Sequence, residues 1–83
     1  MQLNPLVARG RVIAAARMLA GLDQLELAAA AGLSPSTVSK IEQGRRNVRD
    51  ETLRAISRAL EQLGIDLTQN GRTGHHAVGT SYA

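Results

Sequence analysis

Residues 23–44, DQLELAAAAGLSPSTVSKIEQG, hold the signals for two short helices joined by a tight turn. Asp23 can cap a helix over residues 24–31, because its carboxylate can accept hydrogen bonds from the free N–H groups of the first turn. Gly32 follows, where a helix commonly ends on a left-handed residue that glycine adopts without strain. Ser34 and Pro35 repeat the signal of a cap followed by proline. We therefore predict a second helix from about residue 35 to residue 43, ended by Gly44.

This pair of helices has an apolar side and a polar side. We expect five residues to be buried: Leu27, Ala28, Leu33, Val38 and Ile41. The second helix leaves hydroxyl groups and one cation on its other side: Ser34, Ser36, Thr37, Ser39 and Lys40. Ala28 and Ala31 are small where the first helix must approach the second closely. Two short helices with a glycine turn and these two sides are typical of a helix-turn-helix unit.

A longer helix is predicted before this unit. It ends near residue 20 and begins either at Pro5, with Asn4 as its cap, or near Gly10, since glycine lowers helix stability in a helix interior. Residues 1–9 are therefore either a loose arm or the start of this helix. Its apolar residues recur at helical spacing and predict a buried stripe: Ile13, Ala16 and Ala20.

The helix after the unit is the clearest amphipathic helix, with apolar residues at steps of three and four: Leu53, Ile56, Leu60 and Leu63. Its predicted cap is Asn47 together with Asp50, or Asp50 alone, and Gly64 is its stop. Residues 65–68 alternate apolar and polar side chains as a short strand does, and the rest of the tail is rich in Gly, Ser, Thr and Asn. We therefore expect an all-α fold, a compact bundle of four main helices. Its helix-turn-helix domain spans residues 10–64, and a short extension over residues 65–83 forms a strand and then a flexible tail.

The composition excludes several classes of protein. A chain of 83 residues without cysteine has room for one domain and offers no disulfide or thiolate zinc site. No stretch approaches the roughly 18 apolar residues of a membrane span, and no nucleophile, base and orienting acid form a recognisable catalytic pattern. We therefore expect a cytoplasmic, non-enzymatic protein without a cofactor. The net charge of +3 and the pI of about 10.6 favour a polyanionic partner.

Residues 17–60, RMLAGLDQLELAAAAGLSPSTVSKIEQGRRNVRDETLRAISRAL, resemble the Cro and lambda-repressor-like (XRE) family of DNA-binding transcriptional regulators. The resemblance extends over about residues 10–65 without a gap. It rests on these family markers: Arg17, Gln24, Leu27, Ala28, Ala31, Gly32, Leu33, Ser34, Val38, Ile41, Glu42, Gly44, Thr52 and Leu53. One departure is Val48–Arg49, which replaces the Pro–Ser pair common before the last helix. The resemblance implies that the helix over residues 35–43 enters the major groove of double-stranded DNA.

The resemblance also implies roles for individual residues. Those that face base edges are Ser34, Pro35, Ser36, Thr37 and Lys40. Lys40 is the strongest of them, because an ammonium group can donate to O6 and N7 of guanine, whereas a hydroxyl group discriminates less; Pro35 offers an apolar contact to a thymine methyl group. Those that contact phosphates and position the protein are Gln24, Ser39, Gln43, Arg45, Arg46 and Asn47. Arg17 and Glu42 match a structural ion pair between the first helix and the end of the recognition helix.

A helix-turn-helix of this size covers only a few base pairs, so we expect a homodimer on a palindromic operator. Four apolar residues gather at the end of the last helix, more than a small core is expected to cover, and they are the predicted dimer contact: Leu60, Leu63, Ile65 and Leu67. Residues 65–68 could also pair edge to edge with a second copy. The alternative to a DNA-binding regulator is a protein-interaction module, such as an antitoxin or an anti-activator, with secondary or no DNA binding. The adjacent His75 and His76 lack further ligands, so no metal site is predicted.

Overall fold

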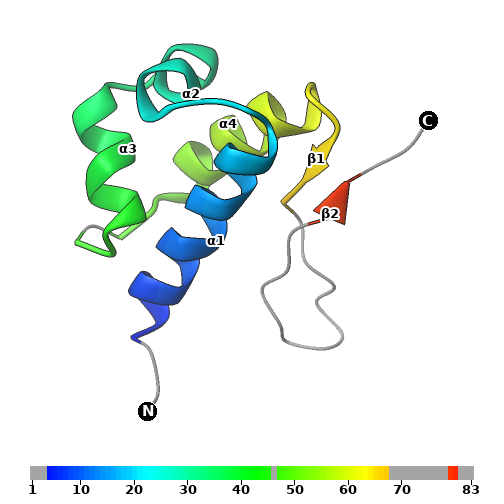
Figure 1. Cartoon of the computed structure of the whole chain (residues 1–83). Coiled ribbons are helices and arrows are strands. Elements are labelled where there is room, and N and C mark those ends of the chain that lie inside the picture. The colour runs from blue at the N-terminus through cyan, green and yellow to red at the C-terminus, as the bar shows by residue number, and fades with distance from the viewer. Residues whose placement is uncertain (1–3, 46, 68–78, 81–83) are drawn as a thin grey trace.

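The computed structural model describes residues 4–45, 47–67 and 79–80, and these residues form four helices and two short strands. The helices are α1 (Pro5–Leu19), α2 (Gln24–Ala31), α3 (Pro35–Glu42) and α4 (Asp50–Glu61). The strands, β1 (Ile65–Asp66) and β2 (Gly79–Thr80), pair antiparallel, with Ile65 opposite Thr80. α2 and α3 lie on one side of α1, and the strands lie on the other (Figure 1). The predicted bundle of four main helices, followed by a short strand, is confirmed.

α1 begins at Pro5, so of the two starts that the sequence leaves open the structure has the earlier one. The Asn4 side chain accepts a hydrogen bond from a backbone N–H of the first turn at 2.8 Å, and Pro5 occupies the first helical position, where its missing N–H costs no hydrogen bond. Gly10 lies inside the helix and is buried. α1 is therefore helical from residue 5 onward, and its N-terminal half packs on the end of α3.

α2 and α3 begin where the sequence predicts. Asp23 and Glu26 form a capping box: the Asp23 carboxylate accepts from the Glu26 N–H at 2.7 Å, and the Glu26 carboxylate accepts from the Asp23 N–H at 2.9 Å. α2 ends on Gly32, whose φ of 70° is left-handed. α3 begins after Ser34 and ends one residue before the predicted end, because Gln43 is already its C-terminal cap.

The predicted cap of α4 is wrong. Arg49 is the N-cap residue, and no side chain closes the first turn with a hydrogen bond. Asp50 is the first residue inside the helix, so it lies one position too late to cap it. Asn47 lies too early, and its Oδ1 accepts from the Val48 N–H at 3.0 Å instead. The sequence therefore predicts the start of α4 to within a few residues but assigns its cap to the wrong residue.

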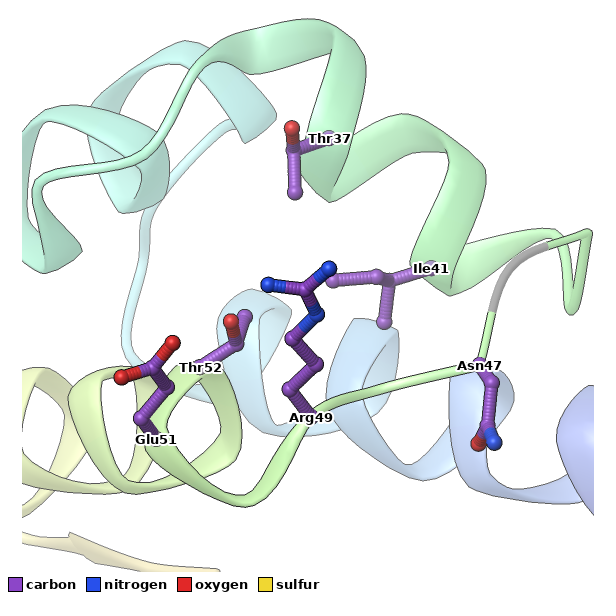
Figure 2. Close-up of a pocket in the computed structure, with 6 residues that line it drawn as sticks. All are labelled: Thr37, Ile41, Asn47, Arg49, Glu51 and Thr52. Carbon is purple, nitrogen blue, oxygen red and sulfur yellow. The ribbon is translucent and has the colours of Figure 1, made fainter.

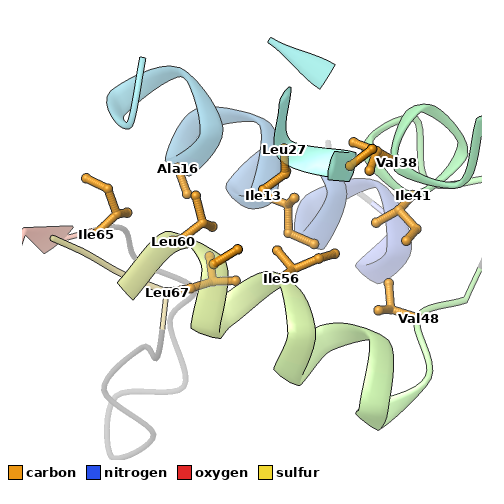
Figure 3. Packing of buried hydrophobic residues seen from close by; sticks show 12 residues of the cluster. Ile13, Ala16, Leu27, Val38, Ile41, Val48, Ile56, Leu60, Ile65 and Leu67 are labelled. Carbon is orange, nitrogen blue, oxygen red and sulfur yellow. The ribbon is translucent and has the colours of Figure 1, made fainter. Parts of the chain in front are cut away.

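One hydrophobic core joins the helices to β1 (Figure 3). Its largest fully buried side chains come from all four helices: Ile13, Leu27, Val38, Ile41, Ile56 and Leu60. Four of the five residues predicted as buried in the helix-turn-helix lie in this core, and Leu33 packs against it partly buried. The core holds α3 by its apolar side and so determines which side of α3 faces solvent.

Three of the four residues predicted to form the dimer contact are instead buried in the core of their own chain. Leu60, Ile65 and Leu67 are 0%, 3% and 6% exposed, so the expectation that these side chains exceed what the core can cover is wrong. β1 already pairs with β2 of the same chain, which occupies one of its edges. Leu63 alone among the four predicted residues is exposed, at 51%. The dimer contact itself stays a prediction.

Candidate nucleic-acid interface

α3 has a buried apolar side and an exposed polar side. Val38 and Ile41 pack in the core. Ser36 and Lys40 are exposed, and neither side chain has a hydrogen bond or ion pair within residues 4–45, 47–67 and 79–80. Because residues four apart lie on the same face of a helix, these two side chains present a hydroxyl and an ammonium group along one strip, the Ser36–Lys40 strip. This strip is free to bond to an external ligand.

Two other predicted base contacts, Ser34 and Thr37, bond to each other at the start of α3. The Ser34 Oγ accepts from the Thr37 backbone N–H at 3.1 Å, and the two hydroxyl oxygens lie 2.9 Å apart. Ser34 is therefore the cap of α3 in the free protein. Pro35, between them, is exposed at the first helical position. A base contact from Ser34 or Thr37 would have to be made in addition to, or instead of, this capping arrangement.

Arg17, Gln24 and Glu42 form a cluster that fixes the end of α3 to α1 and α2. Arg17 donates from Nε and Nη2 to the two carboxylate oxygens of Glu42 at 2.8 and 3.1 Å, and from Nη1 to the Leu22 carbonyl oxygen at 2.9 Å. The two charged side chains are only 14% and 6% exposed. The hydrogen bond to Glu42 raises the pKa of Arg17 above its usual value, because it favours the charged guanidinium. The structure thus contains the ion pair that the family resemblance implies.

Gln24 completes this cluster from the first turn of α2. Its Nε2 donates to Oε1 of Glu42 at 3.0 Å. The resemblance assigns Gln24 to a DNA phosphate, and the same amide group has a second N–H that this bond does not use. A phosphate contact by Gln24 therefore stays a prediction, which is compatible with the bond seen in the free protein.

Three of the predicted phosphate contacts form a hydrogen-bonded row from α3 into the turn after it. Gln43 donates from Nε2 to the Ser39 Oγ at 2.8 Å, and Arg45 donates from Nη1 to the Gln43 Oε1 at 3.4 Å. Gln43 and Arg45 are exposed, and Ser39 is half-buried. The remaining two predictions differ: Asn47 is exposed in the connector, whereas Arg46 lies outside the described residues.

A small pocket lies between α3 and the start of α4 (Figure 2). Its lining residues come from α3, the connector and the first turn of α4: Thr37, Ile41, Asn47, Arg49, Glu51 and Thr52. Figure 2 shows the Arg49 side chain extending from the connector into this pocket, toward α3. Arg49 is not among the DNA contacts predicted from the sequence. The signal that could have found it is the replacement of the Pro–Ser pair by Val48–Arg49.

Features of metal sites and membrane proteins are absent from the part of the chain that the structure describes. No group of three or more His, Asp or Glu side chains there could hold a metal ion. No helix there is both long and apolar enough to cross a bilayer. His75, His76 and most of the predicted flexible tail lie outside the described residues, whereas Gly79–Thr80 of that tail form β2.

Comparison with known proteins finds one family. The model of the helix-turn-helix family matches residues 13–67. Over 48 residues the chain is 35% identical to the HTH-type transcriptional regulator MalR of Streptococcus pneumoniae, and this match covers 58% of the chain and 15% of MalR. The chain therefore corresponds to only a small part of that relative.

Solved structures with a similar fold include those of two regulators. The restriction-modification controller protein C.AhdI from Aeromonas hydrophila is 36% identical with a TM-score of 0.67, and the match covers 68% of this chain and 85% of C.AhdI. The clp gene regulator ClgR from C. glutamicum is 31% identical with a TM-score of 0.69, over 74% of this chain and 78% of ClgR. The family match covers the C-terminal part of α1 and all of α2, α3 and α4. The chain belongs to the XRE-type helix-turn-helix family of DNA-binding transcriptional regulators.

Proposed function

We propose that this protein binds a specific double-stranded DNA site with α3 in the major groove and regulates transcription there. The observation that carries the proposal is the Ser36–Lys40 strip, which is exposed and without a partner in the described residues while the opposite side of α3 is buried. The Lys40 ammonium group can donate to O6 and N7 of guanine, and the Ser36 hydroxyl can donate or accept. Helix-turn-helix units present their base-reading residues in this way.

The surroundings of α3 favour binding because they hold the helix in place before DNA arrives. Ser34 closes its first turn, and the pair of Arg17 with Glu42 ties its last turn to α1. A recognition element that is already ordered loses less conformational entropy on binding. Ordering α3 on binding therefore costs little free energy. More of the free energy gained from the base contacts then appears as affinity.

The row of Ser39, Gln43 and Arg45 supports contact with the sugar–phosphate backbone beside the groove. Hydroxyl, amide and guanidinium groups are all donors to phosphate oxygens. Neutralising phosphates releases counterions, so binding should weaken steeply as the salt concentration rises. These contacts position α3 and do not themselves select the sequence.

Regulation of transcription and assembly as a homodimer complete the proposal. MalR is named as a transcriptional regulator, C.AhdI as a controller protein and ClgR as a gene regulator, which supports the same role here. One α3 covers only a few base pairs, so we expect two copies on a palindromic operator with recognition helices about 34 Å apart. Leu63, exposed at the end of α4, is the residue through which we expect the copies to meet.

Selection of bound sequences from random duplexes tests this proposal. The expected result is a palindromic motif whose half-sites lie about 10 base pairs apart, centre to centre. A single unpaired half-site would contradict the homodimer. Binding without any sequence preference would contradict sequence-specific recognition. No binding even at low salt would contradict the whole proposal and favour the protein-interaction alternative, an antitoxin or an anti-activator.

A further inference from the structure

We infer that Arg49 is a further DNA-contacting residue, whose guanidinium group binds a backbone phosphate beside the groove that α3 enters. The inference rests on the proposed function, because it requires α3 to lie in the major groove. It concerns a residue outside both the recognition helix and the row of Ser39, Gln43 and Arg45. It therefore adds a contact on a different side of α3.

The backbone of Arg49 has the geometry of a helix cap. Its φ and ψ are −69° and 150°, close to the −80° and 149° of Ser34, which caps α3. Ser34 accepts a hydrogen bond from the N–H three residues later, whereas the arginine side chain has no acceptor atom and makes no such bond. A short polar side chain is the ordinary occupant of such a position. The chain thus has a long cation where its local structure favours a cap.

The Arg49 side chain makes no polar contact within the described part of the protein. It is exposed, and its guanidinium group makes no hydrogen bond or ion pair with residues 4–45, 47–67 or 79–80. Glu51 lines the same pocket, yet the two charges do not pair. Arg49 therefore neither caps the helix nor pairs with a carboxylate, and it makes no polar contact in the described residues that would stabilise the fold. Its donors remain available to an external anion.

Arg49 lies beside the base-reading surface of α3. Successive residues are 100° apart around a helix, so Thr37 and Ser39 lie on opposite flanks of the Ser36–Lys40 strip. The Ser39 flank continues into Gln43 and Arg45. The Thr37 flank faces the pocket, into which Arg49 extends (Figure 2).

This arrangement favours a phosphate as the ligand. A helix in the major groove has a sugar–phosphate backbone on each side, and among the described residues that line the pocket on the Thr37 flank Arg49 is the one cation. A guanidinium group can bind two phosphate oxygens at once, which suits recognition of a backbone phosphate. Glu51 lines the pocket too and would repel the phosphate, so Glu51→Gln should strengthen binding modestly.

The test uses the full chain, the selected operator and an unrelated duplex of the same length, over a range of salt concentrations. Arg49→Ala should raise the dissociation constant for both duplexes by a similar factor, about tenfold at low salt, as expected for one charge-assisted hydrogen bond. The salt slope should fall by roughly 0.9. Arg54→Ala removes the same charge from an exposed position of α4 and should change neither quantity.

Arg49→Ser separates DNA contact from helix stability, because serine can supply the missing cap. It should weaken DNA binding as much as Arg49→Ala while raising the melting temperature by roughly 4–8 °C. If Arg49→Ala weakens binding and Arg49→Ser does not, Arg49 acts only through the start of α4 and the inference is wrong. A loss of affinity confined to the operator would show a base contact and would also overturn the phosphate assignment.

The outcomes distinguish this inference from the proposed function. A wild-type protein that binds neither duplex contradicts the proposed function itself. A wild-type protein that binds the operator, and is weakened by Lys40→Ala but not by Arg49→Ala, keeps the proposed function and removes only Arg49 from the interface.

Discussion

Gly10 in α1 lies directly against the carbonyl oxygen of Ile41 at the end of α3: a Cβ atom at residue 10 would come within 2.5 Å of it. The carbonyl oxygen of Glu42 would be equally close. Both neighbours are main-chain atoms, which cannot rotate aside as the end of a flexible side chain can. The packing of α1 on the recognition helix therefore depends on glycine at this position.

Gly10→Ala should lower the free energy of unfolding by about 1–3 kcal/mol, the usual cost of overpacking a well-packed contact. Helix propensity alone would give the opposite sign, since alanine is favoured over glycine by about 1 kcal/mol inside a helix. The measurement is the midpoint and slope of urea unfolding. Arg11→Gly at the next, exposed position is the control and should destabilise through propensity alone. A Gly10→Ala protein more stable than wild type would rule out the close approach.

Gly10 also shows which parts of this fold the sequence can predict. The caps at Asp23 and Ser34 depend on residues within one helical turn, and the sequence predicts both. The role of Gly10 depends on a contact with α3, which lies far along the chain. The sequence alone therefore shows only that a glycine at this position lowers the stability of the helix. Local signals are thus sufficient for most helix ends but not for how one helix crosses another.

The same limit applies to the candidate site. Helical periodicity predicts that Lys40 is exposed and Val38 is buried, and both are observed. Where Arg49 extends depends on the path of the connector, which departs from the family at Val48–Arg49. The burial of Ile65 and Leu67 depends on where β1 packs against α1 and α4. Neither could be predicted from spacing alone.

Arg17→Ala should destabilise the protein by about 3 kcal/mol, because it leaves the largely buried Glu42 carboxylate without its ionic partner. The hydrogen bond from Gln24 remains and keeps the effect toward the lower end of the range for such pairs. Thermal and urea unfolding measure the change. The double variant Arg17→Met, Glu42→Leu removes both charges and should recover much of the loss. Unchanged stability in Arg17→Ala would mean that the pair contributes nothing to folding.

Lys40→Ala should weaken binding to the selected operator by about 1–3 kcal/mol and relax the preference at one base position, since the variant can no longer donate to that base. The fold should be unaffected, because the Lys40 side chain is exposed and has no partner in the described residues. Binding measurements on the operator and on its single-base variants give both quantities. Equal losses on operator and unrelated DNA would exclude Lys40 from base reading.

Arg45→Ala combined with Arg46→Ala should weaken binding to all duplexes alike and lower the salt slope by roughly 0.9 for each phosphate that the variant no longer neutralises. Arg45 is exposed and its guanidinium group makes only a long hydrogen bond, 3.4 Å, to Gln43, so little holds it away from a phosphate. Titrations at several salt concentrations give the slope. If the slope of the double variant equals that of wild type, both arginines are solvated loop residues.

Of the four residues predicted to form the dimer contact, only Leu63 is exposed. Leu60, Ile65 and Leu67 are buried in their own chain, so a charge at any of them would test folding instead of association. Leu63 is 51% exposed, and Leu63→Glu should leave the fold intact. If two copies meet at the end of α4, this substitution brings two carboxylates together and removes apolar surface from the interface, so the dimer dissociation constant should rise at least about tenfold.

Sedimentation velocity of the full chain, with and without the palindromic operator, measures this change. Leu25→Glu is the matched control, because Leu25 is a leucine of α2, a different helix, and is 64% exposed. We expect wild type and Leu25→Glu to be dimers and Leu63→Glu to be a monomer that keeps its helical circular dichroism. Since α3 of a monomer reads only one half-site, Leu63→Glu should also bind an isolated half-site as well as wild type does, but lose the extra affinity for the palindrome. A folded Leu63→Glu protein that stays dimeric would move the contact elsewhere, and a wild-type protein that is monomeric even on the palindrome would remove the dimer from the proposal.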